Sequence, residues 1–99
     1  MENIIVSEIQ CIPIKSQNGL VGFASCVINN QFYVGNIAIY TSPNSLKGFR
    51  LVFPQKKLSS GKVVDCFYPI NKEAEDQVSS AIIKKYVELM DHFHHVEVL

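Results

Sequence analysis

Short polar turns divide the first 41 residues into three runs that are rich in isoleucine, valine and other strand-forming residues. The runs span residues 4–14, 20–28 and 32–41. Between the first two lies Asn18-Gly19, a pair that readily adopts the positive φ angles of a tight hairpin turn. Consecutive strands joined by such short turns favour an antiparallel meander. The fold must therefore be built on a sheet whose early strands pair in chain order.

Two further strands are expected after a loop at residues 42–48. The fourth spans residues 49–53 and ends at Pro54, because proline has no N–H to donate to a ladder. The fifth spans residues 63–68 and follows a turn at Ser59-Ser60-Gly61. The sequence thus predicts a five-stranded antiparallel meander.

A single strong helix signal follows Pro69-Ile70. Asn71 is a favourable N-cap residue, and acidic residues in the first turns suit the positive end of the helix dipole. Apolar residues then recur at steps of three and four, which predicts an amphipathic helix that lies on the sheet: Ala74, Val78, Ala81, Ile82, Tyr86, Leu89, Met90 and Phe93. Ile83 and Val87 fall off this stripe, and either widen the buried face or meet a partner subunit. The expected fold class is α+β.

The 99 residues are sufficient for one domain, spanning residues 1–99 with 93–99 as a candidate mobile tail. Acidic and basic residues balance to a net charge of zero. The N-terminus lacks the features of a signal peptide, and no segment approaches the length of a transmembrane helix. We therefore expect a cytoplasmic protein without a membrane partner.

Basic residues are concentrated in one segment of this neutral chain. No acid lies between Leu46 and Val64, whereas five basic residues lie there: Lys47, Arg50, Lys56, Lys57 and Lys62. A basic loop at the tip of a hairpin is suited to contacting phosphates. Charge alone favours the simpler interpretation, a solvated loop that keeps the protein soluble.

The same segment resembles the SpoVG family of stage V sporulation, or septation, regulators. The resemblance rests on FRLVFPQKK at residues 49–57, followed by Gly61, Asp65 and Pro69-Ile70-Asn71 before a helix. It extends upstream through Phe23-Ala24-Ser25, Phe32, Val34 and Asn36-Ile37, and downstream to Tyr86. Roughly residues 6–89 are covered, and the order and spacing of the matches make the assignment specific.

The resemblance implies a homodimer, formed by strand pairing and exchanged elements, that binds nucleic acid. Lys56 and Lys57 match the family's basic pair and would contact the DNA or RNA backbone. The local excess of positive charge suggests that Lys47, Arg50 and Lys62 assist them. Weak sequence readout is expected, because lysine is a point charge whereas a guanine edge favours a bidentate arginine. The family also implies roles in septation and sporulation.

Several positions depart from the family pattern. Gln10, Ile12, Pro13, Val21 and Ala38 stand where the family often has basic residues. Each missing phosphate contact removes part of the salt-dependent affinity. An alternative hypothesis is therefore a protein-interaction module that keeps the dimeric fold without strong nucleic-acid binding.

No catalytic residues, cofactor or small-molecule substrate are predicted, since the motifs of nucleotide-binding and hydrolytic enzymes are absent. We expect Asp65 to be a buried structural carboxylate. Cys11, Cys26 and Cys66 have no metal-ligand spacing and fit buried, reduced thiols. His92, His94 and His95 either bind a divalent metal or interact with the helix C-terminus, and no metal site is assigned to them.

Aromatic residues lie near the basic segment, including Phe49, Phe53, Phe67 and Tyr68, with Tyr33 and Tyr40 on the third predicted strand. Exposed rings stack on unpaired bases in many nucleic-acid-binding proteins. Aromatic residues in strands more often pack in the core or across strands. We favour packing here, and Tyr68 is the first candidate for exposure.

Overall fold

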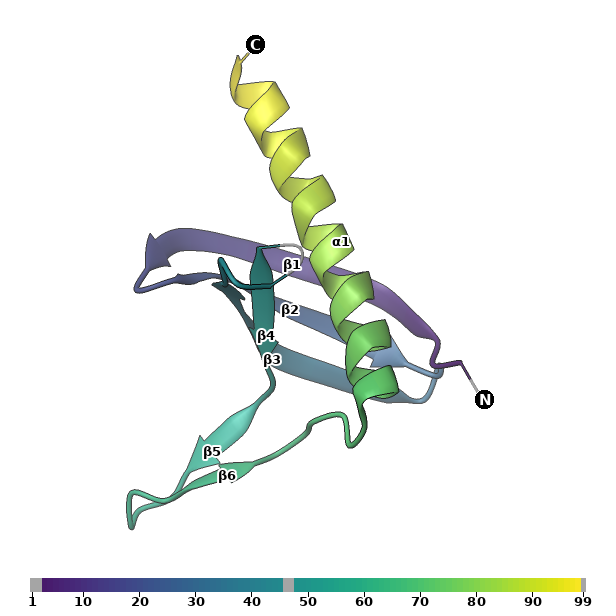
Figure 1. The fold of residues 1–99 in the computed structure, drawn as a ribbon, viewed down its shortest axis with the longest axis vertical. Helices are drawn as coiled ribbons and strands as arrows, with labels where there is room; N and C mark the ends of the chain where they lie inside the picture. The colour runs from purple at the N-terminus through teal and green to yellow at the C-terminus, as the bar shows by residue number, and fades with distance from the viewer. Residues whose placement is uncertain (1–2, 46–47, 99) are drawn as a thin grey trace.

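The computed structural model describes residues 3–45 and 48–98, with side chains as far as residue 92, and places one long helix against an antiparallel sheet (Figure 1). The sheet has four strands in chain order, β1-β2-β3-β4. Their bounds are Val6–Gln17 (β1), Leu20–Ile28 (β2), Phe32–Thr41 (β3) and Phe49–Val52 (β4). The predicted bounds of the second and third strands are confirmed, and β1 starts and ends slightly later than predicted.

Asparagine and glycine form the tight turns of this meander. Asn18 and Gly19 have φ angles of 53° and 89° between Gln17 and Leu20, which pair with each other. Positive φ at both central residues is the geometry that suits the twist of a two-residue hairpin. At the next turn Asn29 and Asn30 also have positive φ. The prediction of hairpin chemistry at these positions is therefore confirmed.

The prediction of a five-stranded meander is wrong in its last step. The chain leaves the sheet after β4, and β5 (Gln55–Lys57) pairs with β6 (Val63–Asp65) as a separate two-stranded sheet. Pro54 cannot continue the β4 ladder. The next three residues are Gln-Lys-Lys, which have no apolar side to place on the core. Two of the lysines predicted in a loop, Lys56 and Lys57, thus lie in a short strand, whereas Lys62 directly precedes β6.

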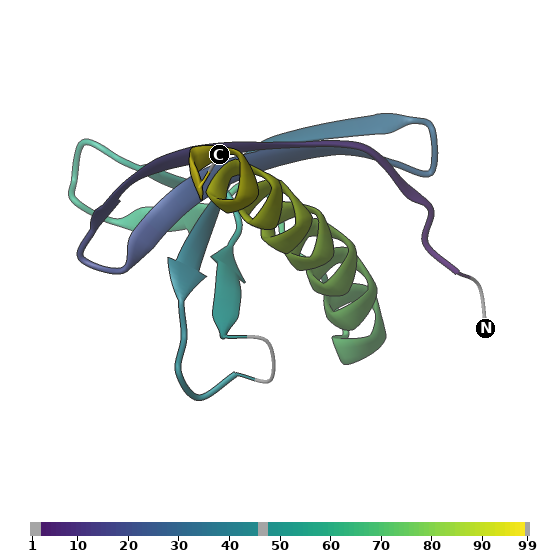
Figure 2. The same cartoon turned by 90° about the horizontal axis from the view of Figure 1, so that it is seen from above.

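The helix α1 (Lys72–Val98) lies on one side of the sheet, as Figure 2 shows. Asn71 caps it: its Oδ1 accepts a hydrogen bond from the Ala74 N–H at 2.8 Å. The predicted N-cap is thereby confirmed. Beyond the sheet the C-terminal part of α1 continues without crossing another strand (Figure 1). Within the described residues no helix is long and apolar enough to cross a membrane.

The core lies between α1 and the facing side of the sheet. Its buried members are Ala24, Cys26, Val34, Ile37, Ile39, Val78, Ile82 and Tyr86. Burial of an isoleucine or valine side chain contributes about 1.5–3 kcal/mol, so this cluster supplies much of the driving force for folding. Ile83, which falls off the main stripe, is also buried. Of the two alternatives predicted for Ile83, a wider buried face of the helix or a contact with a partner subunit, the structure therefore shows the first.

Candidate nucleic-acid interface

Strands β5 and β6 form a two-stranded ribbon, residues 54–66, that projects from the body of the protein (Figure 1). Its register pairs Gln55 with Asp65, Lys56 with Val64, and Lys57 with Val63. Successive residues of a strand point to opposite sides. Lys56 and Lys57 are therefore neighbours in sequence whose side chains lie on opposite faces of the ribbon.

The tip of the ribbon is closed by a turn that requires glycine. The Gly61 N–H donates to the Leu58 carbonyl at 2.9 Å, and the Leu58 N–H donates to the Lys62 carbonyl at 2.7 Å. Gly61 has a φ of 92°, in the region that side-chain-bearing residues rarely adopt. A type I turn followed by a glycine of positive φ is a common hairpin connection. Lys62 is thereby held opposite Leu58.

Two phenylalanines hold the base of the ribbon to the body. The rings of Phe53 and Phe67 lie 6.0 Å apart between centroids, tilted by 50°, and both pack against the core cluster. Beside them the Cys66 N–H donates to the Pro54 carbonyl at 2.9 Å. The base is thus fixed by aromatic packing, whereas residues 55–63 are all exposed.

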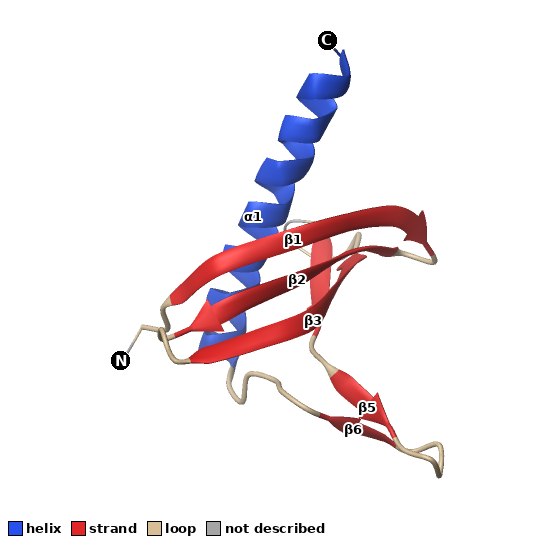
Figure 3. Cartoon of the chain, turned by 180° about the vertical axis from the view of Figure 1, so that it is seen from behind, coloured by secondary structure: helices blue, strands red, loops and turns tan. Residues whose placement is uncertain are grey.

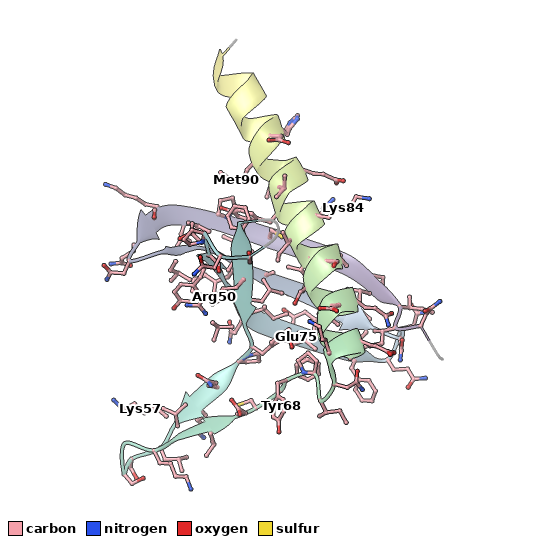
Figure 4. All side chains as sticks on the ribbon, viewed as in Figure 1. Arg50, Lys57, Tyr68, Glu75, Lys84 and Met90 are labelled. Atoms are coloured by element: carbon pink, nitrogen blue, oxygen red, sulfur yellow. The ribbon has the colours of Figure 1, made fainter. Side chains whose placement is uncertain are left out.

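The lysines of the ribbon are open to solvent. Lys56, Lys57 and Lys62 are exposed, and the Lys57 side chain extends away from β5 in Figure 4. Among the described residues, no carboxylate forms an ion pair with any of these three lysines. The ion pair that those residues do form joins Lys72 and Asp76 on α1. Unpaired, solvated ammonium groups on a projecting element are available to a polyanion.

The other two predicted site residues do not join this group. The Arg50 guanidinium lies over the Tyr40 ring, 4.7 Å from its centroid, a cation–π contact across β3 and β4. Arg50 thus belongs to the four-stranded sheet, where it packs against Tyr40, and it is not part of the ribbon. Lys47 lies outside the described residues. The structure therefore brings together three of the five predicted residues.

Asp65 is exposed, so the expectation of a buried carboxylate is wrong. Its Oδ1 accepts a hydrogen bond from Gln55 Nε2 at 2.8 Å, directly across the ribbon. The carboxylate lies in a strand whose sides are both open to solvent, which explains the difference. Asp65 gives one face of the ribbon a negative charge.

The sheet face opposite α1 is the second notable surface, and Figure 3 views it directly. No other element among the described residues covers it. Cross-strand pairing aligns one residue from each strand in a row: Ile12, Phe23, Ala38 and Val52. Ile12 is 65% exposed and Phe23 37% exposed. Two of the apolar departures from the family pattern, at positions 12 and 38, thus share one open face, whereas Val21 packs against the core cluster.

A shallow hollow of about 170 Å³ lies on this open face, beside Gln10, Ile12, Phe23, Ser25, Tyr33 and Asn36. Tyr33 is 74% exposed, which packing preferences alone did not predict. Phe49, Phe53 and Phe67 instead pack against the core, as expected, and Tyr68 is exposed. Strand alternation combined with the correct register would have revealed the open face. The register, however, shifts at four points, including those between Ser7 and Gln10 and between Ala24 and Cys26.

The cysteines are free thiols, but not all are buried. Cys26 is buried, Cys11 is half-buried and Cys66 is exposed on the ribbon. Burial raises the pKa of the Cys26 thiol and, against an opposing effect of Lys85, also raises the pKa of Cys11. A raised pKa leaves these thiols protonated and weakly nucleophilic at neutral pH.

The C-terminal histidines do not form a described site. His92 is exposed, and the side chains of His94 and His95 lie outside the described residues. Within the described part of the chain, no group of three histidine, cysteine or acidic residues is arranged to hold a metal ion.

Comparison with known proteins places the chain in a family. The SpoVG family model matches residues 4–88. A protein of Onion yellows phytoplasma named "Putative septation protein SpoVG" is 30% identical over 86 residues, which cover 87% of this chain and 84% of the relative. Proteins of the same name from Caldicellulosiruptor bescii and Archaeoglobus fulgidus are 30% and 25% identical over 81 and 83 residues, covering 82% and 84% of this chain and 89% and 94% of theirs. This chain belongs to the SpoVG family.

Proposed function

We propose that this protein is a cytoplasmic, homodimeric regulator of the septation type that binds DNA or RNA through the phosphates. The projecting ribbon is the contact element, and its lysines are the contact residues. The observation that carries the proposal is the arrangement of Lys56, Lys57 and Lys62. All three are exposed on one element that stands clear of the body, without ion-pair partners among the described residues.

The chemistry of lysine supports contact with the phosphate backbone of the nucleic acid rather than with its bases. Lysine ammonium groups contact phosphate as point charges and do not recognise a base edge in a bidentate manner. Arg50, the chain's single arginine, is held over Tyr40. The expected binding is therefore dependent on salt and weakly selective for sequence.

Self-association is supported by the surfaces that one chain leaves open. Among the described residues, no strand pairs with the outer edges of β1 and β4, and the face opposite α1 exposes apolar side chains. Exposed strand edges and apolar patches are commonly covered by a second chain. Two copies would also present two ribbons, and linked contacts raise avidity. Light scattering should give twice the mass of one chain, and a strictly monomeric protein would contradict this part of the proposal.

Fluorescence anisotropy with a labelled oligonucleotide of about two helical turns tests the binding proposal. The wild type should bind at about 50 mM salt and weaken by at least tenfold at about 200 mM. The double variant Lys56→Glu/Lys57→Glu should lose binding. Lys84→Glu/Lys85→Glu, which reverses the same charge on the exposed side of α1, should retain most of it. Equal affinities of the two double variants would contradict the proposal.

A protein-interaction module is the second candidate function, favoured by the apolar row on the open sheet face. In this role the exposed Ile12 and Phe23 side chains would contact a protein surface. A pull-down after nuclease treatment distinguishes the two functions. Retention of a partner that is lost with Ile12→Arg supports the second function, whereas a complex that disperses with nuclease contradicts it.

A further inference from the structure

The two faces of the ribbon differ in charge, because its register sorts the charged residues. Lys56 lies opposite Val64, and Lys57 lies opposite Val63. Leu58 and Lys62 form the next pair toward the tip. Strand alternation then places Lys56 and Lys62 on one face and Lys57 and Asp65 on the other. Each face thus carries two charged residues.

On each face the two charged residues are diagonal neighbours. Lys62 lies two residues before Val64, the partner of Lys56, and Asp65 lies two residues after Val63, the partner of Lys57. Diagonal neighbours have Cα atoms about 7–8 Å apart, within reach of long side chains. The first pair is doubly positive. The second pair consists of the cation Lys57 and the anion Asp65, so an approaching phosphate experiences little net charge from it.

Gln55 holds the carboxylate of Asp65 in position. Its amide Nε2 donates to Asp65 Oδ1 at 2.8 Å, which keeps the carboxylate on the Lys57 face. A phosphate that approaches that face therefore meets a negative charge beside the lysine. A phosphate that approaches the other face meets Lys56 and Lys62 together, with an uncharged Leu58 and Val64 beside them.

We infer that nucleic acid binds one face of the ribbon, the face of Lys56 and Lys62, and that Lys57 contributes little to phosphate contact. This inference depends on the proposed nucleic-acid binding and divides the adjacent lysine pair into a contacting and a non-contacting member. The contacting pair consists of residues six positions apart in the sequence. A ribbon that lies on the backbone by one face also leaves its other face free.

Neutralising single variants test this assignment, because all four residues are exposed and the substitutions preserve size. Each should be checked for an unchanged circular dichroism spectrum. The slope of log affinity against log salt is then measured for the wild type, Lys56→Gln, Lys62→Gln, Lys57→Gln and Asp65→Asn on one labelled DNA duplex. Loss of one phosphate contact lowers the slope by about 0.9, or twice that if both ribbons of a dimer are bound.

The expected result is a lower slope for Lys56→Gln and Lys62→Gln, with Lys57→Gln and Asp65→Asn within error of the wild type. Equal losses at Lys56 and Lys57 would overturn the one-face assignment while leaving nucleic-acid binding in place. A marked gain of affinity in Asp65→Asn would overturn it as well, since it would place phosphate beside Asp65. Absence of binding by the wild type at low salt would overturn the proposed function itself, and the assignment with it.

Discussion

The hydroxyl of Tyr86 donates a hydrogen bond to the backbone carbonyl of Val21, 3.3 Å away, and links the middle of α1 to β2. Tyr86 is 4% exposed, and its ring meets the Phe49 ring edge-on, with 5.2 Å between centroids. One residue of the helix therefore contacts two strands of the sheet. This contact fixes the position of α1, and β4 leads directly from Phe49 toward the ribbon.

The stability of the fold should depend on pH through Tyr86. Burial, with a smaller contribution from Cys11, raises the pKa of the Tyr86 hydroxyl. A group whose folded-state pKa is raised stabilises the fold below its unfolded pKa, about 10 for tyrosine, and loses that contribution as pH rises through the raised value. Tyr86→Phe should be about 0.5–1.5 kcal/mol less stable than the wild type at pH 7. Urea unfolding should show this difference shrinking above about pH 10, and a constant difference up to pH 11 would contradict the assignment.

Gly22 should not tolerate a side chain. A Cβ at this position would lie 2.9 Å from the Ile12 carbonyl oxygen and 3.2 Å from the Tyr86 ring. Gly22→Ala should therefore destabilise the protein by about 1–3 kcal/mol, the typical cost of overpacking. Gly35→Ala is the matched control, since the three atoms nearest to its new Cβ all belong to the end of the exposed Tyr33 side chain, which can move. Thermal unfolding should separate the two variants, and equal melting temperatures would show that the close approach at Gly22 relaxes freely.

The N-cap of α1 should contribute measurably to stability. The Asn71 side chain satisfies the Ala74 N–H at 2.8 Å, and Asn71→Ala leaves that donor without its partner. The expected loss is about 1 kcal/mol. Ser80→Ala, at an exposed position within the helix, should change stability by no more than about 0.5 kcal/mol. If Asn71→Ala unfolds at the same denaturant concentration as Ser80→Ala, the cap is not a stabilising contact.

Local signals in the sequence predicted the meander and the helix well. The turn residues Asn18 and Gly19, the N-cap Asn71 and the apolar stripe of α1 act within a few positions of the chain, so they are readable without tertiary information. The fifth strand was mispredicted because the apolar run after Val63 has the pattern of a core strand. Whether such a run joins the sheet depends on the direction of the chain after Pro54.

The candidate site was predicted in composition but not in geometry. The local excess of lysine identified the ribbon, and the family resemblance pointed to Lys56 and Lys57. Their placement on opposite faces follows only from the pairing with β6. The open face of Ile12, Phe23, Ala38 and Val52 similarly depends on a register that shifts at two points between β1 and β2 and at two points between β2 and β3.

The most direct measurement of the central claim is a nuclear magnetic resonance titration of isotopically labelled protein with a short oligonucleotide. It follows every backbone amide as the nucleic acid binds. The account predicts that the largest shifts cluster in the ribbon, at residues 55–65, while the helix from Lys72 to His92 changes little. Shifts concentrated on α1 or on the open sheet face, with the ribbon unchanged, would contradict it.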